Sequence, residues 1–146
     1  MPVRHQMLRA PHQPPDLPPR TAAVYVFSLS AGTQSPAGPG RVLKVGMVNA
    51  NSGPRFKYQH YKEGSTGSTL AGAVRNNRVL WTYLGVRKPV GGYGEWLKRH
   101  TDRDHFFVDA RYSEVVPLLE VYLKGQLGPV FEGSMKKHPY SSRQSA

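Results

Sequence analysis

Two short hydrophobic stretches near the start of the sequence constrain the fold more strongly than any other feature. Residues 22–29 and 41–48 are rich in β-branched and aromatic side chains, and residues 30–40 between them are rich in glycine, proline and serine. Hydrophobic runs that are bounded by turn-forming residues are typical of β-strands. The pattern therefore predicts two neighbouring strands of a hairpin with a long loop.

Further along the chain, the pattern changes to helices and one more strand. A helix is predicted over residues 54–63, because Pro54 suits its first turn and Asn51 or Ser52 can cap it. The remaining signals are a strand over residues 105–110, a helix from Ser113 to about residue 127, weaker helices over residues 68–76 and 93–100, and either a strand or a helix over residues 79–84.

The order of these elements predicts the fold class. Each strand is too short and too apolar to remain alone, so the simplest packing is an α+β fold with a small three-stranded antiparallel sheet flanked by helices. Residues 1–20 contain six of the thirteen prolines and few large apolar side chains, which predicts a flexible arm. Residues 133–146 are expected to form a second flexible, basic tail. One domain over residues 21–132 remains.

The charge of the chain indicates its partner. A formal net charge of +11 is too large for an ordinary solvated surface and predicts a polyanionic partner, with nucleic acid, either DNA or RNA, favoured over a membrane. No run approaches the roughly 18 apolar residues that span a bilayer, and the N-terminus lacks the apolar core of a signal peptide. We therefore expect a cytoplasmic protein without a membrane partner. Because the sequence has no cysteine, any metal ion must be held by oxygen or imidazole ligands.

Two blocks of the sequence share a pattern with a known family. In the first block, residues 23–27 (AVYVF) and 42–46 (VLKVG) precede Arg55, and in the second block, residues 106–129, Glu120 follows two leucines and precedes a proline by nine residues. These blocks resemble the GIY-YIG nucleases, which place a tyrosine on each of two neighbouring strands, an arginine on the next helix and a glutamate on the last helix. The resemblance implies the same small sheet.

The resemblance also implies an activity. It covers residues 22–132 apart from a variable insertion over residues 64–103, and it implies a DNA endonuclease that hydrolyses phosphodiester bonds with Mg²⁺ or Mn²⁺ and leaves 5′-phosphate and 3′-hydroxyl ends. A homodimer would allow both strands to be cut, and a protein partner would add specificity. Two alternatives remain open. One is a catalytically inactive nucleic-acid-binding module of the same fold, and the other is a basic structural or assembly protein.

Four residues take roles by this resemblance. Tyr25 would activate water, Arg55 would hold the scissile phosphate, and Glu120 would bind the metal ion. Lys44 stands at the second tyrosine position, as in some restriction-enzyme members, and would lower the pKa of Tyr25 or contact phosphate. The ordinary alternatives are a half-buried strand tyrosine, an exposed strand lysine, a surface arginine, and a helix glutamate that pairs with Lys124.

Other positions depart from the family or extend the site. Family members often carry a histidine or tyrosine about one helical turn after the arginine, which falls at Gln59 here. Tyr58 shares a helix face with Arg55 and is the favoured catalytic candidate, with His60 and Tyr61 as weaker alternatives. The asparagine of the family beyond the glutamate is replaced by Glu132. The residues predicted to contact nucleic acid are Lys57, His60, Lys62, Arg75 and Arg78.

Overall fold

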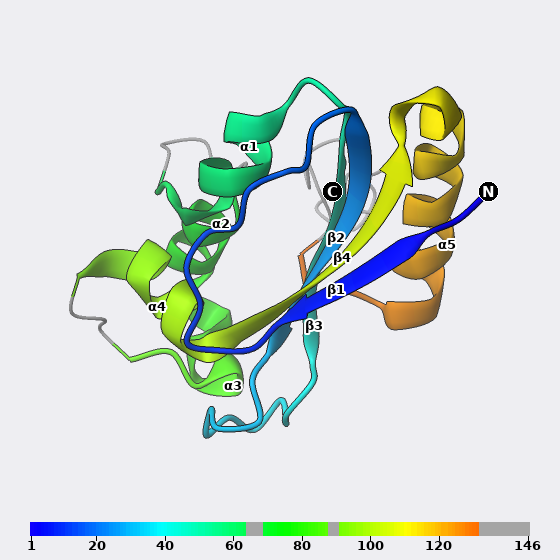
Figure 1. Cartoon of the computed structure of the whole chain (residues 1–146). Helices are drawn as coiled ribbons and strands as arrows, with labels where there is room; N and C mark the ends of the chain where they lie inside the picture. Colours follow the sequence, from blue (N-terminus) through cyan, green and yellow to red (C-terminus); the bar gives the residue numbers. More distant parts are fainter. Residues whose placement is uncertain (64–68, 88–90, 132–146) are drawn as a thin grey trace, which may run out of the picture.

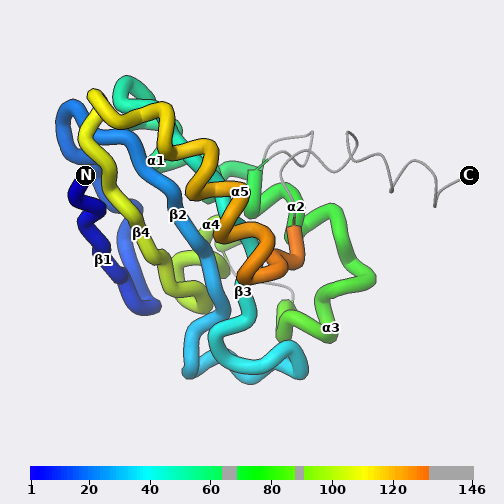
Figure 2. Tube along the Cα trace, turned by 90° about the vertical axis from the view of Figure 1, so that its right-hand side faces the viewer, coloured from blue at the N-terminus to red at the C-terminus, as the bar shows by residue number. Residues whose placement is uncertain are grey.

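The central layer of the molecule is a four-stranded antiparallel sheet (Figure 1). The structure is a computed structural model that describes residues 1–63, 69–87 and 91–131. Its strands stand in the order β1-β4-β2-β3, as Figure 2 shows from left to right. The class is α+β, as predicted, but the sheet has one strand more than the predicted three. The strands are β1 (Arg4–Leu8), β2 (Thr21–Leu29), β3 (Val42–Val48) and β4 (Thr101–Asp109).

The additional strand comes from the segment predicted to be a flexible arm. Arg4–Leu8 pairs with β4 at the edge of the sheet. Beyond it, the buried His12 ring donates from Nδ1 to the Thr101 carbonyl at 2.9 Å and accepts at Nε2 from the Tyr61 hydroxyl at 2.6 Å. The prediction was wrong here because it counted apolar side chains, whereas a largely exposed edge strand is held by backbone hydrogen bonds.

The predicted hairpin of β2 and β3 is confirmed, and its register determines which side chains share a face. Tyr25 lies opposite Gly46, and Phe27 lies opposite Lys44. Opposed residues of an antiparallel pair point to the same face, and so do residues two positions apart on one strand. Tyr25 and Lys44 are therefore diagonal neighbours on one face of the sheet.

Helices cover both faces of the sheet (Figure 1). On one face, Phe56, Leu70 and Trp96 pack with Phe27 in the larger hydrophobic core, and on the other face Val116 packs in a smaller, valine-rich core. The α-helices of the first face are α1 (Gly53–Tyr58), α2 (Leu70–Asn76), α3 (Trp81–Leu84) and α4 (Gly92–His100). Two short 3-10 helices, η1 (Gln59–Tyr61) and η2 (Arg78–Leu80), lie between them. The 3-10 helix η3 (Ala110–Val115) and the helix α5 (Val116–Leu127) follow β4.

Several predicted boundaries differ from the structure. The first α-helix ends at Tyr58 and continues as a 3-10 turn, and the last helix begins after Val115 rather than at Ser113. Residues 79–84 are helical, so the strand alternative is wrong there. The predicted basic tail over 133–146 lies outside the described residues. Within the described ranges, no helix is long and apolar enough to cross a bilayer.

Candidate active site

The candidate active site is a cleft of about 270 Å³ at the edge of β3. Residues 44–47 of β3 all line it, and because successive strand residues point to opposite faces, the cleft extends around the strand edge. A side chain from α5 on one face of the sheet can thereby share the space with side chains from α1 on the other. The polar residues of the lining are Tyr25, Lys44, Arg55, Gln59, His60, Glu120 and Lys124.

Four of the five residues predicted to carry catalysis are brought together in this cleft. Tyr25 comes from β2, Lys44 from β3, Arg55 from the first turn of α1, and Glu120 from α5. The strand order places β2 beside β3, and the packing of α5 on β3 closes the far side. Residues that are up to 95 positions apart in sequence therefore face one volume.

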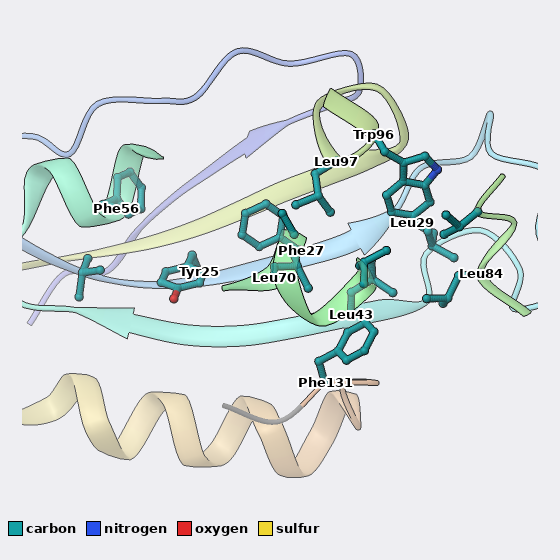
Figure 3. Packing of buried hydrophobic residues seen from close by; sticks show 14 of the residues in the cluster. Tyr25, Phe27, Leu29, Leu43, Phe56, Leu70, Leu84, Trp96, Leu97 and Phe131 are labelled. Atoms are coloured by element: carbon teal, nitrogen blue, oxygen red, sulfur yellow. The ribbon is translucent and has the colours of Figure 1, made fainter. Parts of the chain in front are cut away.

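Tyr25 is held by the core and by a histidine. Its side chain is 3% exposed, and its ring packs edge-on against Phe27 and Phe56. Figure 3 shows Tyr25 beside Phe27 in this cluster, with its hydroxyl oxygen directed toward the neighbouring strand. A methyl group at Gly46 would overlap that hydroxyl, so any larger residue opposite Tyr25 would displace the phenol ring. The hydroxyl forms a short hydrogen bond with His60 Nε2.

The second nitrogen of His60 determines the direction of that bond. The backbone N–H of Leu70 donates to His60 Nδ1 at 3.2 Å, so Nδ1 carries no proton. Burial, with Lys44 and Arg103 nearby, lowers the pKa of His60 to about 3, so the ring is neutral at physiological pH. A neutral ring then bears its proton on Nε2, which donates to the Tyr25 oxygen. The hydroxyl proton of Tyr25 is therefore free to form a hydrogen bond with a molecule bound in the cleft.

The predicted effect of Lys44 on Tyr25 is not what the structure shows. Burial raises the pKa of Tyr25 to about 12, and the cations that oppose this effect are Arg103 and Arg55 rather than Lys44. Desolvation outweighs the charges because the phenol is almost fully enclosed. Tyr25 therefore remains protonated at neutral pH.

Among the cleft residues with a shifted pKa, Lys44 is the one whose pKa lies close to neutral pH. It is 7% exposed, which excludes the alternative of an exposed strand lysine. Burial lowers its pKa to about 8; Lys124 and Arg55 act in the same direction, and Glu120 opposes them. A lysine with such a pKa exists partly as the free amine at pH 7 to 8 and can accept a proton.

Arg55 and Glu120 bring opposite charges to the cleft. Arg55 is exposed, and no acidic partner binds it in the described part of the chain. Glu120 is the carboxylate of the lining, and its Oε1 lies 3.3 Å from Lys124 Nζ. The predicted alternative of an i,i+4 pair is therefore correct, and the same carboxylate also faces the cleft. Lys124 itself was not predicted as a cleft residue.

The structure places Tyr58, the favoured catalytic candidate one turn after Arg55, outside the cleft. It is 48% exposed and lines a different groove, whereas His60 is 5% exposed and contacts Tyr25. The prediction assumed an unbroken α-helix, in which residues i and i+3 share a face. Because α1 ends at Tyr58 and tightens into η1, the chain rotates and turns His60 toward the sheet.

Only one of the five residues predicted to contact nucleic acid, His60, lines this cleft. His60 is enclosed in the cleft, and Lys57 and Lys62 line the second groove together with Tyr58 and Lys98. Lys57 is paired with Asp16 at 2.8 Å. Arg75 donates to the Glu63 carbonyl at 2.7 Å, and Arg78 lies over the Trp81 ring at 5.2 Å, so neither belongs to the cleft. Their predicted nucleic-acid contacts remain predictions.

Metal binding at this site rests on a small donor set. The described residues contain no cluster of three or more histidine, aspartate or glutamate side chains that could enclose an ion. Glu120 is the one carboxylate that lines the cleft within the described ranges, and Mg²⁺ is commonly bound by one or two carboxylates together with substrate phosphate and water. The residues fit such an open site, and they do not fit a closed structural metal site. Glu132 lies outside the described residues.

Comparison with known proteins identifies no significant relative of this chain. No protein-family model matches the sequence, and neither the curated proteins nor the solved structures give a significant match. The functional argument therefore rests on the residues of the cleft.

Proposed function

We propose that this chain is a divalent-metal-dependent DNA endonuclease of the GIY-YIG type. The observation that supports this proposal best is the convergence of Tyr25, Lys44, Arg55 and Glu120 from four separate elements on one cleft. The set contains a proton acceptor, a phosphate-binding cation and an acidic oxygen ligand, which are the groups that phosphodiester hydrolysis needs. The net charge of +11 suits a DNA substrate.

The proposed reaction follows from the state of each side chain. Arg55 offers a planar pair of donors to two oxygens of the scissile phosphate. The oxygen of the Tyr25 hydroxyl already accepts a hydrogen bond from His60. The hydroxyl therefore donates its own hydrogen bond to a water molecule and orients it. The unprotonated amine of Lys44 accepts a proton from that water as the water oxygen attacks phosphorus. The bond between phosphorus and the 3′ oxygen breaks, and the departing 3′ oxygen takes up a proton from solvent water. This yields the 5′-phosphate and 3′-hydroxyl ends.

Glu120 would hold Mg²⁺ or Mn²⁺, which supplies positive charge to the phosphate and to the leaving oxygen. To do so, its carboxylate must exchange the contact with Lys124 for the ion. Lys124, which also lines the cleft, would then offer an additional cation to the phosphate.

Plasmid cleavage tests the proposal. Purified protein is incubated with supercoiled DNA in Mg²⁺, Mn²⁺ or EDTA, and a parallel reaction contains RNA. We expect cutting that requires the ion and is lost, by at least about 100-fold, in Glu120→Gln. The matched control is Glu114→Gln, an exposed glutamate on η3. Absence of cutting of any DNA by the wild type, in both ions, would refute the nuclease.

The second candidate is a nucleic-acid-binding module without catalysis. It is favoured by the pairing of Glu120 with Lys124, which keeps the carboxylate occupied. This candidate predicts DNA binding that weakens with salt and is unaffected by Glu120→Gln, together with no cleavage. The same two variants therefore separate the candidates.

A further inference from the structure

A buried arginine lies directly beneath the candidate site. Arg103 on β4 is 0% exposed and is the largest fully buried side chain in the described part of the chain. It lies opposite Phe27 in the sheet, on the face that carries Tyr25. Among the described residues, no carboxylate pairs with it, and its Nε has no hydrogen-bond partner. A cation in such a place is costly unless it serves a specific contact.

The contacts of Arg103 all lead to one segment and one ring cluster. Nη2 donates to the Phe56 carbonyl at 3.2 Å, and Nη1 donates to the Tyr61 hydroxyl at 3.1 Å. The guanidinium also lies 4.7 Å from the ring centres of Phe27 and Phe56 and 5.7 Å from that of Tyr25. The two hydrogen bonds thus hold the beginning and the end of residues 56–61.

Residues 56–61 contain His60, which an unbroken α-helix would not turn toward Tyr25. Within residues 56–61, α1 ends and η1 begins, and this change turns His60 toward Tyr25. An apolar side chain could fill the aromatic cage around position 103, but it could not bind a backbone carbonyl and a hydroxyl simultaneously. The two directed bonds of the guanidinium fork fix the rotation of the segment, which packing against rings alone leaves less specified.

We propose that Arg103 is a positioning residue of the candidate active site, which holds residues 56–61 in the rotation that places His60 against Tyr25. Arg103 does not touch DNA, because it has no exposed surface. Its importance for catalysis rests on the proposed nuclease function, whereas its effect on His60 is independent of that function.

Nitrogen NMR of the full chain labelled at histidine tests this role without any cleavage. The His60 ring should show an unprotonated Nδ1 and a hydrogen-bonded Nε2 proton, and the signal is assigned by its loss in His60→Gln. In Arg103→Met, with circular dichroism and Tm confirming the fold, we expect this hydrogen-bonded signal to be lost. Arg103→Lys, which keeps the charge but not the fork, should weaken it. Arg99→Met, at an exposed arginine of α4, is the control.

The outcomes decide the proposal. A folded Arg103→Met protein that keeps the His60 signal would overturn it. If Arg103→Met does not fold, the Lys variant decides in the same way, and failure of both variants to fold would overturn the proposal in favour of a purely structural role. In cleavage assays, Arg103→Met should reduce kcat about 100-fold with KM for DNA unchanged, because a displacement of about 1 Å is enough for such a loss. If the wild type does not cut DNA, the nuclease proposal fails, and NMR still decides the positioning role.

Discussion

Replacement of Lys44 by methionine should stabilise the protein while it abolishes cleavage. Lys44 is buried in the cleft, and its pKa falls from 10.5 to about 8, chiefly through burial. A fall of about 2.5 in pKa corresponds to a cost of about 3 kcal/mol for keeping the ammonium in the fold at pH 7. Lys44→Met removes that cost and keeps a chain of similar length, so the free energy of unfolding should rise by about 1 to 3 kcal/mol.

The stability difference between Lys44→Met and the wild type should depend on pH. Between pH 8 and 10.5 the unfolded chain binds a proton at Lys44 that the folded protein has already lost, so the wild type becomes more stable relative to the variant as the pH rises. The advantage of Lys44→Met should therefore shrink to less than about 1 kcal/mol at pH 10. At pH 7 the variant should melt roughly 3 to 10 °C higher than the wild type.

Urea unfolding at pH 7 and pH 10, followed by circular dichroism, measures both quantities. The control is Lys62→Met, at an exposed lysine of the same charge, which should change stability little at either pH. A Lys44→Met protein that is less stable than the wild type at pH 7, or an advantage that is equal at both values, would refute the reasoning. Retained plasmid cleavage by this variant would show that Lys44 is not the proton acceptor.

Two further predictions concern the surroundings of Tyr25. Gly46→Ala should displace the Tyr25 hydroxyl and lower the free energy of unfolding, measured with urea, by about 1 to 3 kcal/mol. The control Gly125→Ala adds a methyl group in open space on α5 and should raise the free energy of unfolding by roughly 0.5 to 1 kcal/mol. Because the pKa of His60 falls to about 3 on burial, the unfolded chain binds a proton below pH 6.5 that the folded protein does not. Stability should therefore decline as the pH falls from 6.5 toward 3, by up to about 1.4 kcal/mol per pH unit for this residue, and His60→Gln should flatten the slope measured by urea unfolding at several pH values.

The resemblance named four residues that line one cleft, and it could do so because its signals are local. The hairpin of β2 and β3 follows from two runs of strand-forming residues with a turn-rich segment between them. Arg55 follows from a proline at the start of a helix, and Glu120 from a leucine-rich pattern in the last helix. Such patterns depend on neighbours in the chain and can be recognised without the fold.

Other features depend on contacts that no local pattern contains. The strand Arg4–Leu8 exists because β4 offers it a free edge, although β4 lies about a hundred positions away in the chain. His60 rather than Tyr58 reaches Tyr25 because α1 ends at Tyr58, where packing and the bonds from Arg103 hold the turn.

The sequence by itself determined the residue types of the site, the order of its elements, and the pairing of β2 with β3. The tertiary structure alone decided which side chains meet and in which protonation state. The two Tyr25 neighbours that matter most, His60 and Arg103, are buried beside it, and burial overturns the expected lowering of the Tyr25 pKa. The physical reason is that desolvation depends on how completely the folded chain encloses a group, which the neighbours in sequence do not determine.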